Sequence, residues 1–173
     1  IGTDPEGYTV VAFGGRYLYF IPDHNGDDKH GEVLRYDSES DFEVASSWSV
    51  FDLTSIDADL KGYRGVFFDG SRYLYLVPFH DGDGSHYNFI KLDTEGSFTE
   101  ASSWEVYNPS DAGVGFGDSN NFRDPVFDGR YAYFLSKTSA EVLRLDTEGV
   151  FSETSSWSFI NLGESLTVGP APA

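Results

Sequence analysis

The stretch Phe13-Gly-Gly-Arg-Tyr-Leu-Tyr-Phe-Ile-Pro22 decides the fold, because the chain repeats it twice. Its copies are Phe68-Asp-Gly-Ser-Arg-Tyr-Leu-Tyr-Leu-Val-Pro78 and Phe127-Asp-Gly-Arg-Tyr-Ala-Tyr-Phe-Leu135. After each copy comes a shorter apolar run that ends in Asp, and then a Ser-Ser-Trp sequence. The spacing of the copies gives an internal period of roughly 50 residues, which is typical of proteins built from repeated supersecondary units.

Each repeat contains four short segments with the composition of β-strands. A brief apolar run leads into a Gly-containing turn of the kind that closes hairpins, and the aromatic-rich stretch follows it. The third and fourth segments are runs such as Val33–Tyr36 and Trp48–Val50. Four antiparallel strands per unit are typical of a β-propeller blade, so we expect an all-β fold. The chain is expected to form a single three-blade unit, residues 1–173, with blades at about 8–53, 63–108 and 122–162 and a linker-like tail at 163–173.

The repeat resembles those of the kelch-type β-propeller families. The repeat length, the Tyr-containing second strand, the Tyr-Asp or Leu-Asp that ends the third strand and the following Trp all match that pattern. One feature departs from it, because Ile21-Pro22, Val77-Pro78 and Leu135-Ser136 replace the diglycine that follows the second strand of kelch repeats. The resemblance implies the architecture of kelch-like and lectin-like propellers, a fold that hosts enzymes, lectins and scaffolds alike.

Three blades do not close a propeller, because closed rings contain about four to eight. We expect a second copy or an adjacent repeat to complete the ring, most simply as six blades. The outer faces of the first and third blades would otherwise expose large apolar surfaces, lined by residues such as Tyr17, Tyr19, Tyr131 and Tyr133. Exposed patches of that size are rare on soluble monomers. The third blade of one unit is therefore expected to pack against the first blade of the next.

The charge and composition of the chain exclude several classes of partner. The formal net charge is −18, with 29 Asp and Glu against 11 Lys and Arg. We therefore expect no binding to nucleic acid, which needs clustered cations, and no insertion into a membrane, because no run approaches the roughly 20 apolar residues of a spanning helix. The chain has no Cys, hence no disulfide framework. It also has no Met, from which we expect a mature secreted product or a piece of a longer protein, located outside the cell.

The loops that follow the second strands of the first two blades are the richest in functional groups. Three interpretations stay open for these loops, residues 22–30 and 78–86. Their Asp, Asn and Gly residues suit turn geometry, their imidazoles and carboxylates suit the hydroxyl groups of a sugar, and their acids suit a metal ion. Aligning the two loops brings all four histidines of the chain into register, His24 with His80 and His30 with His86.

A calcium site is the metal hypothesis that the spacing supports best. Asp23-x-Asn25-x-Asp27 places oxygen ligands at alternate positions, as a calcium-binding loop does. The segment lacks the Gly and the distal Glu of an EF-hand, and the second loop keeps only Asp81 and Asp83. Zinc would need three or four converging ligands, which the two histidines of each loop do not supply.

An aromatic residue and an arginine precede the first strands of the second and third blades, as Tyr63-Arg64 and Phe122-Arg123. These positions would lie near the axial opening of a ring. Arg64 and Arg123 would there grip a carboxylate or a sugar acid in bidentate fashion, or pair with the abundant acids of the chain. Tyr63 stands beside them as a further candidate for ligand binding.

Recurrence in all three repeats favours a structural role for two further sets of charged residues. We expect the cations inside the third strands to pair between blades, and the acids that end these strands to form turns. The cations are Arg35, Lys91 and Arg144, and the acids are Asp37, Asp93 and Asp146.

Two functions from different classes stay open. No nucleophile elbow, metalloprotease motif, P-loop or dinucleotide fingerprint occurs in the sequence, and we expect no enzyme. The first function is that of a secreted, non-catalytic propeller that binds a glycan or another small polar ligand through its loop face. The second is that of a structural building block of an extracellular filament or surface assembly, made of tandem or self-associating units.

Overall fold

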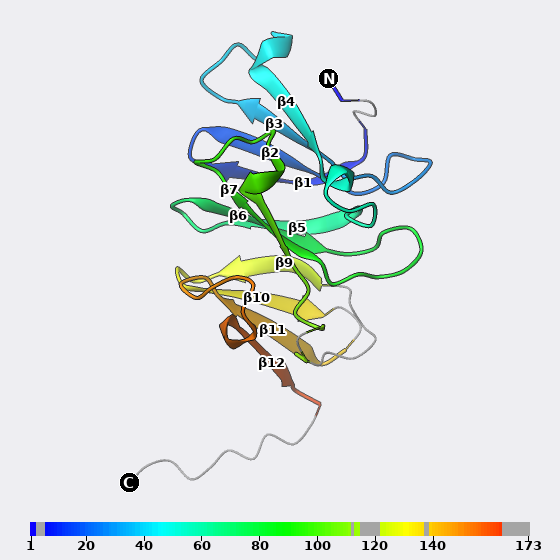
Figure 1. The fold of residues 1–173 in the computed structure, drawn as a ribbon, viewed down its shortest axis with the longest axis vertical. Helices are drawn as coiled ribbons and strands as arrows, with labels where there is room; N and C mark the ends of the chain where they lie inside the picture. The colour runs from blue at the N-terminus through cyan, green and yellow to red at the C-terminus, as the bar shows by residue number, and fades with distance from the viewer. Residues whose placement is uncertain (3–5, 112, 115–121, 137–138, 164–173) are drawn as a thin grey trace.

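The chain folds into three four-stranded antiparallel sheets, one from each sequence repeat (Figure 1). The structure is a computed structural model, and it describes residues 1–2, 6–111, 113–114, 122–136 and 139–163. In every sheet the strands lie in chain order, so each strand pairs with the one before it and the one after it. The expected all-β fold of three four-stranded blades is confirmed.

The strand boundaries repeat from blade to blade. Blade 1 contains β1 (Tyr8–Gly14), β2 (Tyr17–Pro22), β3 (Glu32–Asp37) and β4 (Trp48–Asp52). Blade 2 contains β5 (Tyr63–Phe68), β6 (Tyr73–Pro78), β7 (Phe89–Asp93) and β8 (Trp104–Tyr107). Blade 3 contains β9 (Phe122–Phe127), β10 (Tyr131–Ser136), β11 (Glu141–Asp146) and β12 (Trp157–Asn161). In the part of the chain that is described, no helix has the length and apolar character needed to cross a bilayer.

The three sheets stack face to face in chain order, with blade 2 between the other two (Figure 1). Their first strands lie side by side, because β1 contacts β5 and β5 contacts β9. This arrangement is that of consecutive blades in a β-propeller. It also explains why β6 is apolar on both faces: Leu74, Tyr75, Leu76 and Val77 are all buried, since a neighbouring sheet covers each side.

Two hydrophobic clusters hold the stack together. The cluster between blades 1 and 2 joins Tyr19 and Ile21 of β2 to Leu74 and Leu76 of β6. The cluster between blades 2 and 3 is built in the same way and includes Trp157. Each blade therefore presents one set of alternating side chains to the preceding blade and the other set to the following blade, as the pleat of a β-strand requires.

The expectation that Tyr19 and Tyr17 line an open outer face of blade 1 is wrong. Tyr19 is fully buried and its ring packs at 6.1 Å from that of Phe98 in blade 2. Tyr17 packs against the same cluster. Because side chains alternate along β2, the open face of blade 1 is formed instead by residues such as Leu18 and Phe20, which are half-buried.

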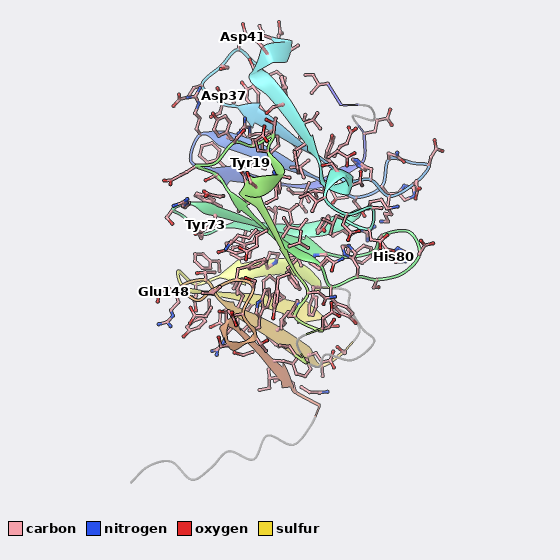
Figure 2. The ribbon with its side chains drawn as sticks, viewed as in Figure 1. Tyr19, Asp37, Asp41, Tyr73, His80 and Glu148 are labelled. Atoms are coloured by element: carbon pink, nitrogen blue, oxygen red, sulfur yellow. The ribbon has the colours of Figure 1, made fainter. Side chains whose placement is uncertain are left out.

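The two edges of the stack differ in chemistry. Figure 2 shows His80 on a loop at one edge, and Asp37 and Glu148 on turns at the opposite edge. The histidine-rich loops join the second and third strands, so they all emerge at the first edge. We call it the loop edge, and it is the place to search for a binding site because its loops are held on a rigid scaffold.

Candidate functional site

The first histidine of each loop shapes the turn in which it stands. The Nδ1 atom of His24 accepts a hydrogen bond of 2.9 Å from the N–H of Gly26, and His80 accepts one of 3.0 Å from Gly82. Both glycines have a left-handed backbone conformation, with φ of 107° and 118°, which residues with a Cβ rarely adopt. The alignment made from the sequence is thus reflected in two loops of the same shape.

The second histidine of each loop is buried against a tyrosine. His30 packs edge-on against Tyr8, with ring centroids 5.5 Å apart, and His86 packs in the same way against Tyr63 at 5.2 Å. Both ring nitrogens of His30 and of His86 are buried, and none of them has a hydrogen-bond partner among the described residues. Burial lowers the pKa of His86, and a neutral ring is the form that fits this apolar contact. Tyr63 itself donates a hydrogen bond to the Asn88 carbonyl.

The oxygen atoms proposed as calcium ligands cap backbone turns. The Asn25 Oδ1 atom accepts from the N–H groups of Asp27 and Asp28, and the Asp81 Oδ1 atom accepts from those of Asp83 and Gly84. Burial works to raise the pKa of Asp81, but these N–H donors outweigh it and lower the pKa. Within the described ranges, no three His, Asp or Glu residues converge as metal ligands would. Calcium binding therefore stays a prediction.

Asp23 stands apart from the other loop acids, because it is buried between two cations. Its carboxylate accepts from the Lys29 ammonium and, at 2.7 Å, from the Arg64 guanidinium of the next blade. Arg64 also lies 3.9 Å above the Phe79 ring. Of the two roles open for Arg64, pairing with an acid of the chain is the one that the structure contains. Sequence reasoning did not identify Asp23 as the partner of Arg64, because the two residues lie in different repeats.

A β-bulge aims Arg64 at this carboxylate. The register of β5 against β6 shifts between Tyr63 and Gly65, so Arg64 is the extra residue. Bulges re-aim single side chains in this way. Arg64 also borders a hollow of about 270 Å³, shared with Thr9, Val10 and Asp124.

Arg123, the equivalent of Arg64 in blade 3, is described only by its backbone. It lies in β9 and pairs with Leu135 of β10. Its side chain lies outside the described part of the structure, so its proposed contact with a ligand stays a prediction.

A polar hollow opens at the loop edge beside blade 1, and its lining includes His30, one of the candidates from the sequence. It measures about 220 Å³ and brings charged groups of both signs together. Lys61 contributes to it from the connection between the blades, a residue with no motif around it. The lining residues are Lys29, His30, Gly31, Glu32, Asp52, Thr54 and Lys61.

A third hollow lies away from all these loops, on the open face of blade 3. It measures about 280 Å³ and combines apolar side chains with one guanidinium group. The lining residues are Tyr133, Val142, Arg144, Ser158, Phe159 and Ile160. We call it the blade-3 socket.

In comparisons with known proteins, no protein-family model and no curated protein matches the chain.

Proposed function

We propose that the chain is a non-catalytic structural unit that completes a β-propeller with other units of its own kind. The observation that carries this proposal is the state of its two end faces. Positions that are buried between blades inside the chain recur at both ends with their side chains in contact with solvent. Each end of the chain thus carries one side of a blade–blade interface. The complete interface, with both sides present, occurs between blades 1 and 2 and again between blades 2 and 3.

The open face of blade 3 is one half-interface. Leu135 is 54 % exposed, whereas its equivalents Ile21 and Val77 are fully buried by the following blade. Tyr133 is half-buried, whereas Tyr19 is fully buried. Burying a large aliphatic side chain contributes about 1.5–3 kcal/mol. A further blade that covers this face would bury several such side chains and be stabilised accordingly.

The open face of blade 1 is the other half-interface. Leu18 and Phe20 are half-buried, whereas their equivalents in blade 2, Leu74 and Leu76, are fully buried. Trp48 is likewise half-buried, while Trp104 is only 6 % exposed. The two open faces are complementary. The open face of blade 1 corresponds to the side of blade 2 that packs on blade 1, and the open face of blade 3 corresponds to the side of blade 2 that packs on blade 3.

The mass of the particle in solution tests this proposal. Two chains of 19.2 kDa that complete a six-bladed ring would sediment as a discrete dimer, and chains that join without closing would form long polymers. Either result supports assembly, and electron microscopy distinguishes ring from filament. A chain that stays monomeric at millimolar concentration would rule the assembly out.

A second candidate function is binding of a small polar ligand, such as a glycan, at the loop edge. It is favoured by the polar hollow, in which Lys29 and Lys61 meet in a chain that has only 11 cations. Titration calorimetry against a panel of neutral and acidic sugars, with and without calcium, would test it. Loss of any signal in Lys61→Ala, with binding retained in Lys91→Ala, would locate the ligand in this hollow. Absence of binding to every sugar contradicts it.

Three further proposals concern relationship, location and chemistry. We propose a distant relation to kelch-type and lectin-like propellers, which rests on the repeat pattern quoted from the sequence. We also propose an extracellular location, to be tested by fractionating the source material for the protein. The proposal that the chain has no catalytic activity would be overturned by turnover of a glycoside or ester substrate that depends on a single carboxylate of the chain.

A further inference from the structure

The segment between the third and fourth strands forms the same element in every blade. It begins with Phe, ends with Trp six residues later, and includes a short 3-10 turn. The indole N–H donates to the carbonyl of that Phe, at 2.9, 3.0 and 2.8 Å in the three blades. We call this element the Phe–Trp elbow, and its three copies are residues 42–48, 98–104 and 151–157.

The elbow of blade 2 covers the face of blade 1. Phe98 lies 4.2 Å from the Arg35 guanidinium, in a cation–π contact, and packs against Tyr19. Trp104 stacks on Phe51, with ring centroids 4.9 Å apart and an angle of 10° between the rings. Phe98 is only 3 % exposed as a result.

The elbow of blade 3 repeats this contact on blade 2. Phe151 lies 5.1 Å from the Lys91 ammonium and 5.9 Å from the Tyr75 ring. Trp157 packs on Tyr107, the equivalent of Phe51, at 5.9 Å. Phe151 is 2 % exposed. One rule therefore holds at both internal interfaces: the elbow Phe of a blade covers the strand-3 cation and the strand-2 tyrosine of the blade before it.

In the part of the chain that is described, the same groups lack their counterparts at the two ends: blade 1 has an elbow with no blade before it to cover, and blade 3 has a surface with no elbow over it. The elbow of blade 1 presents Phe42, which is 63 % exposed. The blade-3 socket contains Arg144, Tyr133 and Ile160, the equivalents of Arg35, Tyr19 and Phe51. The socket thus has the cation, the tyrosine and the apolar wall that surround the elbow Phe at both internal interfaces.

We propose that the blade-3 socket receives the Phe42 side chain of a second copy of this chain, a contact that rests on the self-assembly proposed above. The phenyl ring lies over the Arg144 guanidinium, as Phe98 lies over Arg35, and a cation–π contact of this kind stabilises a desolvated pair. Ile160 stands at the position of Phe51 and Tyr107, and the socket is a hollow of about 280 Å³ that the incoming side chain would enter.

The contact is heterologous, because it joins different surfaces of the two copies. Such a contact closes into a ring when its rotation divides the circle evenly and otherwise continues as a filament. In a closed pair of copies the contact occurs twice, once at each junction between blade 3 and blade 1. Each copy then contributes one elbow and one socket.

The proposal is tested with two defective variants that complement one another. Phe42→Asp removes the phenyl ring that enters the socket and leaves the blade-3 socket intact. Ile160→Asp places a charge in the socket and leaves Phe42 intact. Both residues contact solvent in the single chain, so both variants should keep the far-ultraviolet circular dichroism of the wild type. Each variant alone should associate at least about 30-fold more weakly than the wild type, the loss typical of an interface hot spot. An equimolar mixture should form a dimer through its one intact contact.

A matched control is Val150→Asp. Val150 is 62 % exposed and immediately precedes the elbow of blade 3, which is already docked on blade 2. This variant should associate as the wild type does. Wild-type assembly that persists unchanged in Phe42→Asp would overturn the socket contact and leave self-assembly standing. A wild-type chain that remains at 19.2 kDa would overturn both. Failure of the mixture to dimerise would also overturn the heterologous contact.

Discussion

Asp23 is a buried acid at the junction between the first two blades. It is 2 % exposed and faces Lys29 of its own loop, which is 9 % exposed at its side chain, and Arg64 of β5. The buried charges of Asp23 and Lys29 are tolerated because they pair with each other, and Arg64, which is 31 % exposed at its side chain, adds a second cation to the carboxylate. The carboxylate thereby ties the loop of blade 1 to the first strand of blade 2.

Asp23→Asn should therefore destabilise the chain strongly. The change keeps the shape of the side chain but leaves the Lys29 ammonium buried without a compensating charge, and breaking such a pair costs about 3–5 kcal/mol. Urea unfolding followed by tryptophan fluorescence measures the effect. The control is Asp27→Asn on the exposed part of the same loop, expected within about 0.5 kcal/mol of wild type. Equal losses of unfolding free energy in the two variants would mean that the charge of Asp23 does not stabilise the fold more than that of an exposed loop acid.

A second charged pair, repeated in every blade, joins the start of the second strand to the end of the third. In blade 2 the Arg72 guanidinium donates two hydrogen bonds to Asp93, and that contact lowers the pKa of the carboxyl. A carboxyl with a lowered folded-state pKa stabilises the fold above its unfolded value of about 3.9, and this contribution disappears as the pH falls through the folded-state pKa. The acids that end the third strands thus serve as anchors for arginines as well as turn residues.

Arg72→Gln should therefore lower stability near neutral pH and have progressively less effect below about pH 4. The measurement is the difference in urea midpoint between variant and wild type at a series of pH values from neutral to acid. Lys61→Gln removes the same charge from the loop edge and serves as the control for net charge. A midpoint difference that stays constant down to the acid limit would contradict the anchoring role of Asp93.

The Phe–Trp elbows are the elements that convert a stack of sheets into interlocked blades. Their recurrence was visible in the sequence, but the surface that each one covers belongs to the preceding repeat. Phe98 is buried in this way, whereas Phe42, at the same position of its own repeat, is 63 % exposed. The same element therefore has a different energetic role at the end of the chain.

Phe98→Ala should cost about 3–5 kcal/mol of unfolding free energy, as expected for a buried aromatic ring. Phe42→Ala should cost less than about 1 kcal/mol when both variants are unfolded in urea at a concentration too low for assembly. This pair is well matched, because the substitution and the local element are identical. Equal losses would show that Phe42 is already covered within its own chain.

The regular parts of the fold were predictable from local sequence, and the contacts between repeats were not. Strand segments, glycine turns and the number of blades follow from patterns within about 50 residues, and the structure contains them. The face to which Tyr19 points was wrongly assigned, because β2 is apolar on both sides and its composition does not distinguish them. Likewise nothing near Asp23 in the sequence identifies Arg64 as its partner, and the hollow that includes Lys61 arises only where the connection after blade 1 folds back beside that blade.

The net charge of the molecule would oppose the assembly proposed above. Two copies that meet each bring a net charge of −18, so their long-range repulsion must be overcome by the apolar end faces. Salt screens such repulsion: the screening length falls from about 30 Å at 0.01 M to about 3 Å at 1 M. The interior of the proposed interface, being apolar with one cation–π contact, would be much less sensitive to salt.

Association should consequently strengthen when sodium chloride is raised from about 0.01 M to about 1 M. Sedimentation velocity at several protein concentrations gives the dissociation constant at each salt concentration. Phe42→Asp, measured in parallel, should associate at least about 30-fold more weakly than the wild type at every salt concentration, which separates the specific contact from general salting-out. Weaker association at high salt would indicate an interface held mainly by ion pairs.

The order of strands within the sheets has a consequence for the way in which the protein is made. Because each sheet is formed by consecutive strands, no hydrogen-bonded pair has to wait for a distant part of the chain, and local pairings of this kind form quickly. Synthesis from the N-terminus delivers one blade after another, so blade 1 is complete before the last repeat has left the ribosome. A lone blade buries only part of its apolar surface, and each new blade stabilises the one before it, as in linear repeat arrays. Folding is therefore expected to proceed by addition to a growing end, and blade 3 offers the surface on which a further blade would pack.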